Sequence, residues 1–116
     1  MTKLEKDLRD EWRKLRATYP ERLAGCSFKI NGRFKTKLGV CRSRRSDGMP
    51  VSVELARMCV VDEAMREQAF DTLYHETAHA LAGHAAGHGP EWKAMCRKLG
   101  ANPERLANLT SDQRAV

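Results

Sequence analysis

A cluster of histidines is the feature that most constrains how this sequence can fold. All four histidines of the 116-residue chain lie between positions 75 and 88. The stretch begins with HETAH, an H-E-x-x-H pattern in which Glu76 follows His75 and precedes His79. Residues four apart on an α-helix project from the same face. The pattern therefore predicts a helix that presents His75 and His79 side by side.

This spacing is typical of a zinc site. Two imidazoles one helical turn apart can bind one Zn²⁺ ion, and the adjacent glutamate can take a proton from a water molecule at an open position. A catalytic zinc usually has a third protein ligand. His88 follows Gly87, where the chain can turn back towards the helix, so we favour it for that place. His84 lies about 140° around the helix from His79 and is expected to face solvent, to pack, or to assist near a substrate.

Helical patterns also lie at both ends of the chain. Apolar residues recur at helical spacing in segment 2–18 and predict an amphipathic helix. The histidine helix is expected from about position 62 until the glycines after position 82 end it. A final helix is expected to begin at Pro90 and to end at Gly100, since proline suits a first turn and glycine a C-terminal cap.

A small sheet is expected between the first two helices. Apolar and polar residues alternate around 28–30, 34–40 and 51–55, which is typical of strands with one buried face. Asn31-Gly32 is the preferred pair for a type I′ hairpin turn. The sequence thus predicts an α+β fold with an N-terminal helix, a three-stranded antiparallel sheet, the H-E-x-x-H helix and a C-terminal helix.

Composition places the chain among ordinary globular domains. Hydrophobic residues make up 41% and charged residues 31%. We expect one domain over 1–116, with a core at about 24–106 and a loose tail at 107–116. The absence of a signal-peptide pattern and of a long apolar run indicates a cytoplasmic protein without a membrane partner. The four cysteines lack C-x-x-C spacing and are expected to be reduced thiols.

Positive charge is concentrated in the first part of the chain. Residues 1–46 hold 14 Lys and Arg against 5 Asp and Glu, whereas residues 47–116 hold 7 against 10. On the predicted middle strand, this charge forms one face of the sheet. Such a face is either a solvated surface or a surface that contacts nucleic acid. The candidate contacts are Lys29, Arg33, Lys35, Lys37, Arg42, Arg44 and Arg45.

Four segments in order resemble one known family. They are LGVCRSRRSDGMPVSVEL, DTLYHETAHA, GHGPEWKAM and LGANPER, and they cover roughly residues 24–106. Together they resemble the SprT-like metalloprotease domain, the group that includes the Spartan proteases. Many members continue into a cysteine-rich zinc ribbon, which this chain is expected to lack.

The resemblance implies a minimal zincin-like domain with peptidase activity on protein substrates. It implies that His75, His79 and His88 bind zinc, that Glu76 is the general base and acid, and that Trp92 packs beside the third ligand. Spartan-like members cleave proteins attached to DNA, so a nucleoid location and DNA contact through the basic sheet face are also expected, together with a monomeric state.

Two other functions are compatible with these residues. One is a nucleic-acid-binding module in which the zinc is not catalytic. The other is a regulatory protein that keeps zinc without turnover. Three histidines beside a glutamate leave an open coordination position, whereas structural zinc sites tend to be closed and rich in cysteine. The ligand set therefore favours the enzyme.

Overall fold

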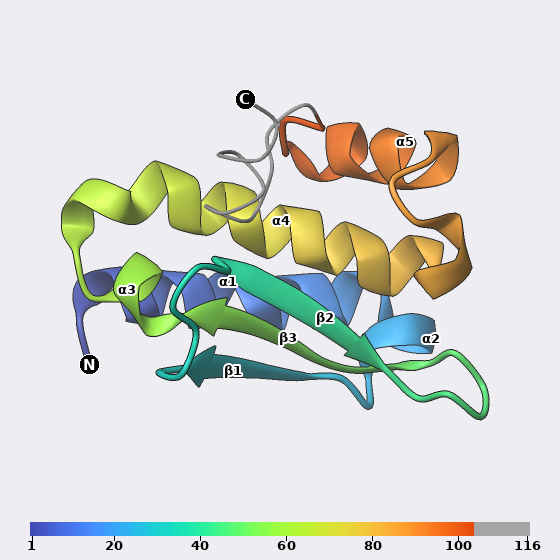
Figure 1. The fold of residues 1–116 in the computed structure, drawn as a ribbon, viewed down its shortest axis with the longest axis horizontal. Helices are drawn as coiled ribbons and strands as arrows, with labels where there is room; N and C mark the ends of the chain where they lie inside the picture. Colours follow the sequence, from blue (N-terminus) through green and yellow to red (C-terminus); the bar gives the residue numbers. More distant parts are fainter. Residues whose placement is uncertain (104–116) are drawn as a thin grey trace.

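A three-stranded sheet with helices packed against it forms the protein (Figure 1). The structure is a computed structural model and describes residues 1–103, so the tail expected at 107–116 lies outside the described residues. The strands are β1 (Ser27–Asn31), β2 (Gly39–Ser43) and β3 (Pro50–Ala56). The helices are α1 (Lys3–Thr18), α2 (Pro20–Leu23), α3 (Arg57–Val60), α4 (Arg66–Ala82) and α5 (Pro90–Leu99), with the 3₁₀ turns η1 (Glu63–Met65) and η2 (His84–Ala86).

The sheet is mixed, and the prediction of a purely antiparallel sheet was wrong. Its order is β1-β3-β2, with β1 parallel and β2 antiparallel to β3. A type I′ turn needs positive φ at both central residues, and neither Asn31 nor Gly32 has it. Instead, the Asn31 side chain accepts a bond from the backbone N–H of Arg33 at 2.8 Å and donates to Glu54 at 3.0 Å. The chain therefore leaves β1 and crosses to the other side of β3.

The predicted basic face of a middle strand does not exist either. The middle strand is β3, and the strand expected at 34–40 begins only at Gly39. Residues 32–38 form the connection that crosses to β2, and β2 is an edge strand. Segment 34–38 alternates like a strand, but it has only an isolated β-bridge at Lys37, and a continuous strand begins at Gly39. Local periodicity does not by itself supply a pairing partner.

Helix α1 covers the apolar face of the sheet. Its stripe of Leu4, Leu8, Trp12 and Leu15 is buried, which confirms the predicted amphipathic helix. The Trp12 ring lies 6.1 Å from the ring of Phe28 in β1. The first helix and the sheet thus share one hydrophobic core.

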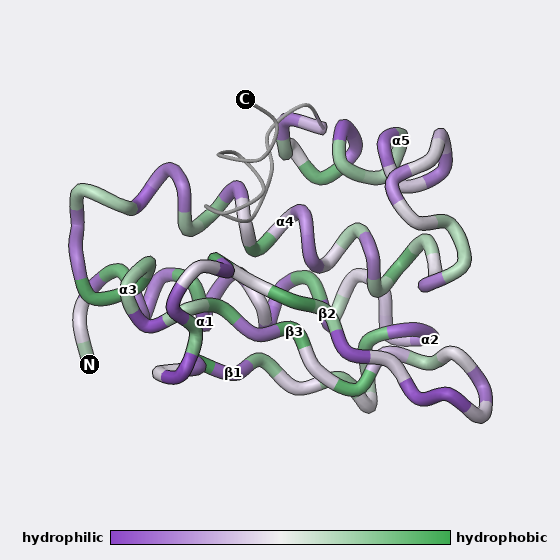
Figure 2. Tube along the Cα trace, viewed as in Figure 1, coloured by the Kyte–Doolittle hydropathy of each residue, from purple (hydrophilic) through white to green (hydrophobic). Residues whose placement is uncertain are grey.

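Helix α4 lies between the sheet and α5 (Figure 1). Buried residues such as Leu73 and Ala80 belong to the core shared with the sheet, whereas Ala78 packs with Trp92 and Cys96 of α5. Green and purple alternate along its turns in Figure 2, because apolar residues on two sides are interrupted by polar ones. A helix that is buried on two sides offers little free surface, so its polar residues lie at packed positions.

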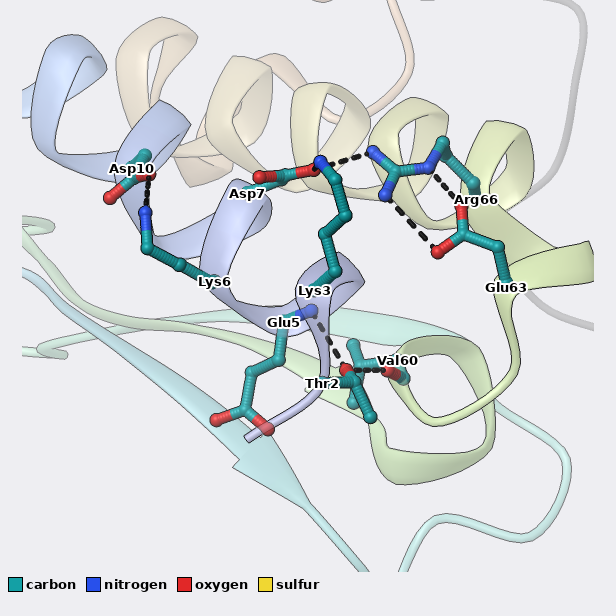
Figure 3. A network of polar contacts seen from close by, with 9 residues as sticks. All are labelled: Thr2, Lys3, Glu5, Lys6, Asp7, Asp10, Val60, Glu63 and Arg66. Carbon is teal, nitrogen blue, oxygen red and sulfur yellow. Dashed lines mark hydrogen bonds and ion pairs between the residues drawn. The ribbon is translucent and has the colours of Figure 1, made fainter.

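Polar contacts attach the start of α4 to the N-terminus (Figure 3). Arg66 donates to Asp7 of α1 at 2.9 Å and also pairs with Glu63. The Thr2 hydroxyl accepts from the backbone N–H of Glu5 at 3.0 Å and donates to the carbonyl of Val60 at 3.0 Å. These contacts fix where α4 begins relative to α1.

The cysteines agree with the expectation of reduced thiols. Cys26, Cys59 and Cys96 are buried, Cys41 is half-buried, and all four are free thiols. Burial raises the pKa of Cys41 to about 12, so its thiol stays protonated and unreactive at neutral pH. Within residues 1–103, no helix has the length and apolar composition needed to cross a membrane.

Gly39 allows β2 to lie close to α4. A Cβ atom built at this position would lie 2.6 Å from Cγ2 of Thr72 and 3.2 Å from Cγ of Glu76. We expect Gly39→Ala to destabilise the fold by about 1–3 kcal/mol, because the backbones cannot separate without loss of packing. Urea unfolding measures the change. Gly25→Ala is the matched control, since nothing lies within 4 Å of the position that its methyl group would occupy and its stability should be unchanged.

Candidate active site

Helix α4 places the residues of the H-E-x-x-H pattern at packed positions. The side chains of His75 and Glu76 are 3% and 7% exposed, and His79 is half-buried. The helix confirms the segment predicted to run from about position 62 to 82, although α4 proper begins at Arg66 after the turn η1. A pair of largely buried polar residues on a helix needs partners, and these come from α5, β2 and the segment after α5.

Trp92 of α5 contacts all three histidines that were proposed as ligands. Its ring centre lies 5.2 Å from that of His75, 5.1 Å from that of His79 and 4.7 Å from that of His88. Its indole N–H donates to the backbone carbonyl of His75 at 3.2 Å. Trp92 is 3% exposed. The packing of Trp92 beside His88, which the resemblance implied, is present.

The chain turns back after α4 and brings His88 to His79. Gly83 ends α4 with φ of 93°, and Gly87 has φ of 53°, both in the region that favours glycine. The ring centres of His79 and His88 are 4.8 Å apart. His84 lies in η2 and is exposed, and it makes no ring contact with another histidine in the described part of the chain. The geometry agrees with our preference for His88, while its role as a ligand stays a prediction.

His75 is held by residues that follow α5. Its Nε2–H donates to the carbonyl of Asn102 at 2.6 Å, and the same nitrogen lies 3.4 Å from a carboxylate oxygen of Asp71. The backbone N–H of Asn102 in turn donates to Asp71 at 3.0 Å. Within residues 1–103, no group of three or more His, Cys, Asp or Glu side chains is arranged to hold a metal ion.

The donor chemistry nevertheless fits zinc. Burial, with the nearby His88, His75 and His84, lowers the pKa of His79 to about 4, so that imidazole is neutral and its lone pair is available at neutral pH. In a neutral His75 that donates from Nε2, the lone pair is on Nδ1. A metal-binding imidazole is commonly held by a carbonyl or carboxylate at its other nitrogen, as Asn102 and Asp71 hold His75.

Glu76 occupies a different side of α4, next to β2. Burial raises its pKa to about 7, and Lys37 partly opposes the shift. The side chain is buried, with Gly39 of β2 close to its Cγ atom, and burial disfavours the charged form of a carboxyl group. A carboxyl group that titrates near neutrality can both accept and return a proton in one reaction cycle.

The seven basic residues of segment 29–45 are dispersed. Lys29 lies on β1 opposite Glu54, and Arg42 on β2 pairs with Glu54 at 2.8 Å. Arg44 pairs with Asp47 at 2.9 Å in the turn between β2 and β3. Arg33, Lys35 and Lys37 lie in the connection before β2 and Arg45 lies in the turn, and all seven residues are exposed. These residues do not form one ladder, and nucleic-acid contact by any of them stays a prediction.

Sequence reasoning missed two neighbours of the site. Asn102 occurs in the segment LGANPER, but nothing in the sequence showed that its backbone carbonyl reaches His75. Lys37 was considered only as a nucleic-acid contact, yet its positive charge lowers the pKa of Glu76 and partly opposes the effect of burial. Tyr74 takes no part in the site, because it lies on another side of the helix and its hydroxyl donates to Glu11 of α1 at 3.1 Å.

Comparison with known proteins gives one result that bears on this site. No curated protein matches the chain. A family model described as the SprT-like family matches residues 6–112. The matched segment includes His75, His79 and His88 and the helix α5 with Trp92. The chain therefore belongs to the SprT-like family.

Proposed function

We propose that this protein is a zinc-dependent metallopeptidase that hydrolyses peptide bonds in protein substrates. The observation that carries the proposal is the contact of one tryptophan with the three imidazoles, next to a buried glutamate whose pKa lies near 7. Membership of the SprT-like family supports the same reaction class. A structural zinc site would give no reason to bury a carboxyl group beside the histidines, because a buried carboxylate opposes folding.

The edge strand β2 supports a polypeptide as the substrate. One side of β2 pairs with β3, and within the described residues its other side has no strand partner. The strand packs against α4 beside Glu76. An extended peptide can add to such an edge through its backbone groups, which places a peptide bond close to Glu76 without dependence on side-chain identity.

The chain's own residues divide the work as follows. His75, His79 and His88 would hold the metal, and Trp92, Asn102 and Asp71 would orient the rings. A bound zinc ion supplies Lewis acidity for water activation and for polarising a carbonyl. Glu76 takes the proton of the attacking water on its carboxylate and delivers it to the amine that leaves.

The test combines metal content with cleavage in two matched variants. Purified wild-type protein should bind one equivalent of zinc and cleave an unfolded protein substrate, and a chelator should stop cleavage until zinc returns. His88→Ala should lose the zinc and the activity, because a third ligand is removed. His84→Ala removes an exposed histidine only four positions earlier and should keep the zinc.

Metal analysis by mass spectrometry and a fluorescent-casein assay provide the two measurements. Zinc that is retained in His88→Ala and lost in His84→Ala would contradict the ligand assignment. Cleavage that continues in the metal-free protein would contradict the reaction class. The resemblance to Spartan-like proteases suggests DNA-associated proteins as substrates, so the assay is run with and without DNA.

A further inference from the structure

A cleft with excess positive charge lies between the turn that follows β2 and the segment that follows α4. Its volume is about 610 Å³. Its walls are the turn between β2 and β3, with Arg44 and Arg45, and the segment after α4, with His84; Arg22 of α2 also lines it. Figure 1 shows the turn and this segment at the same end of the molecule, and Figure 2 shows the turn as hydrophilic.

The arginines of this cleft are only partly neutralised. Asp47 is the one carboxylate in the lining, and it is already paired with Arg44 through two bonds of 2.9 and 3.1 Å. Arg22 is half-buried, and its described partners are neutral: the carbonyls of Ala80 and Gly48 and the sulfur of Met49. A guanidinium held among neutral groups keeps its charge and attracts an anion from outside.

Arg45 adds a second charge that is exposed. Among residues 1–103 it has neither an ion pair nor a hydrogen bond, and it lines the same cleft as Arg22. Arg22 is rigidly positioned by three contacts, whereas Arg45 can move to meet a ligand. The pair therefore combines a fixed and an adjustable donor for a carboxylate.

The position of the cleft links it to the candidate active site. Gly83, which lines the cleft, donates its backbone N–H to the carbonyl of His79 at 3.0 Å. Ser43, also in the lining, is the last residue of β2, the strand that lies against Glu76 at Gly39. A polypeptide extended along β2 would reach the cleft a few residues from the peptide bond near Glu76.

We propose that this cleft binds an acidic side chain, glutamate or aspartate, of the protein substrate on one side of the cleaved bond, an inference that rests on the proposed peptidase function. The cleft is bounded by two walls and is of a size for a few side chains. It also lies at the end of the edge strand β2, along which a peptide would add. This continuity with the β2 edge favours a peptide over a nucleic acid as the occupant.

The experiment measures peptide binding separately from cleavage. A fluorescein-labelled peptide with a run of glutamates, and the same peptide with glutamines at those positions, are titrated against Glu76→Gln protein and followed by anisotropy. We expect the glutamate peptide to bind about tenfold more tightly, and the difference to shrink at high salt. When Arg45→Ala is added to this protein, the ratio of the affinities for the glutamate and glutamine peptides should fall to near unity. Arg45→Gln should have the same effect.

Arg13→Ala is the matched control. Arg13 is an exposed arginine on α1 that pairs with Asp10 and lies outside this cleft, so its loss changes the net charge equally and should leave the preference intact. A preference that survives both Arg45 substitutions, or that falls equally in Arg13→Ala, would overturn the inference. An oligonucleotide that displaces the glutamate peptide and loses its own affinity in Arg45→Ala would assign the cleft to nucleic acid instead.

A cleavage assay with zinc-loaded wild type separates the two proposals. If both peptides are cleaved but the binding titration shows no preference that depends on Arg45, the inference about the cleft is wrong and the peptidase function is supported. If the preference for the glutamate peptide depends on Arg45 but no peptide is cleaved, the peptidase function is contradicted and the cleft is a binding site for acidic peptides.

Discussion

Glu76→Gln is expected to lower kcat for peptide cleavage by about 10²- to 10⁴-fold, the usual contribution of general acid–base catalysis. Glutamine fills the same space beside Gly39 and Thr72, so the fold and the metal content should be retained. It cannot accept a proton from the attacking water or return it to the amine. Steady-state cleavage of a quenched fluorescent peptide gives kcat, and mass spectrometry gives the zinc content of the same sample.

The control for this variant is Glu91→Gln. Glu91 lies in the first turn of α5 beside Trp92, is exposed, and undergoes the same chemical change. Its kcat should equal that of wild type. Equal kcat in Glu76→Gln and Glu91→Gln, with zinc present in both, would show that Glu76 does not carry the proton. The histidines would then remain as a metal site, and the binding of acidic segments would become the leading clue to function.

Trp92→Ala is expected to have the largest effect on stability, about 3–5 kcal/mol in the free energy of unfolding. The ring is almost fully buried between α4 and α5, and its removal leaves a cavity beside three imidazoles. It also removes the N–H donor to the carbonyl of His75. Urea unfolding in the presence of a chelator isolates this packing effect, because bound zinc would add stability through ligand linkage.

Trp92→Phe provides the conservative comparison. It keeps an aromatic ring of smaller size and loses the indole N–H, so its loss of stability should be less than half that of Trp92→Ala. Zinc affinity should follow the same order, since rings that are no longer packed must be ordered when the metal binds. Similar zinc affinity in wild type and Trp92→Ala would show that Trp92 holds α5 on α4 but does not organise the histidines.

The parts of the fold that were predicted correctly depend on local patterns. The apolar residues of α1 repeat every three to four positions. Only a helix places all of them on one face, where they can be buried together. Pro90 and Gly100 bound α5 as expected, the latter with φ of 98°. The pairing of His79 with His88 was also expected, because it needs only a helix and glycines that let the chain reverse.

The parts that were predicted wrongly depend on contacts between distant residues. Asn31-Gly32 carries a strong hairpin signal, yet Glu54, far along the chain, binds the Asn31 side chain and β1 pairs with β3. Register and strand order are properties of the whole sheet, and a turn preference of two residues is too weak to set them. The basic segment that was expected to be the middle strand also depends on strand order. Its residues 32–38 form the connection to β2, and β2 is an edge strand.

The pairing of His75 and His79 on one face of α4 follows from the order of the amino acids, because residues four apart lie on the same side of a helix with 3.6 residues per turn. The surroundings of these side chains come from the packing of distant segments. This packing set Glu76 against β2, where burial raises its pKa, and it brought Asn102 to His75. It also joined Arg22, Arg45 and His84, from three separate segments, around one cleft. Burial and electrostatic environment come from packing between segments, and no local pattern encodes that packing.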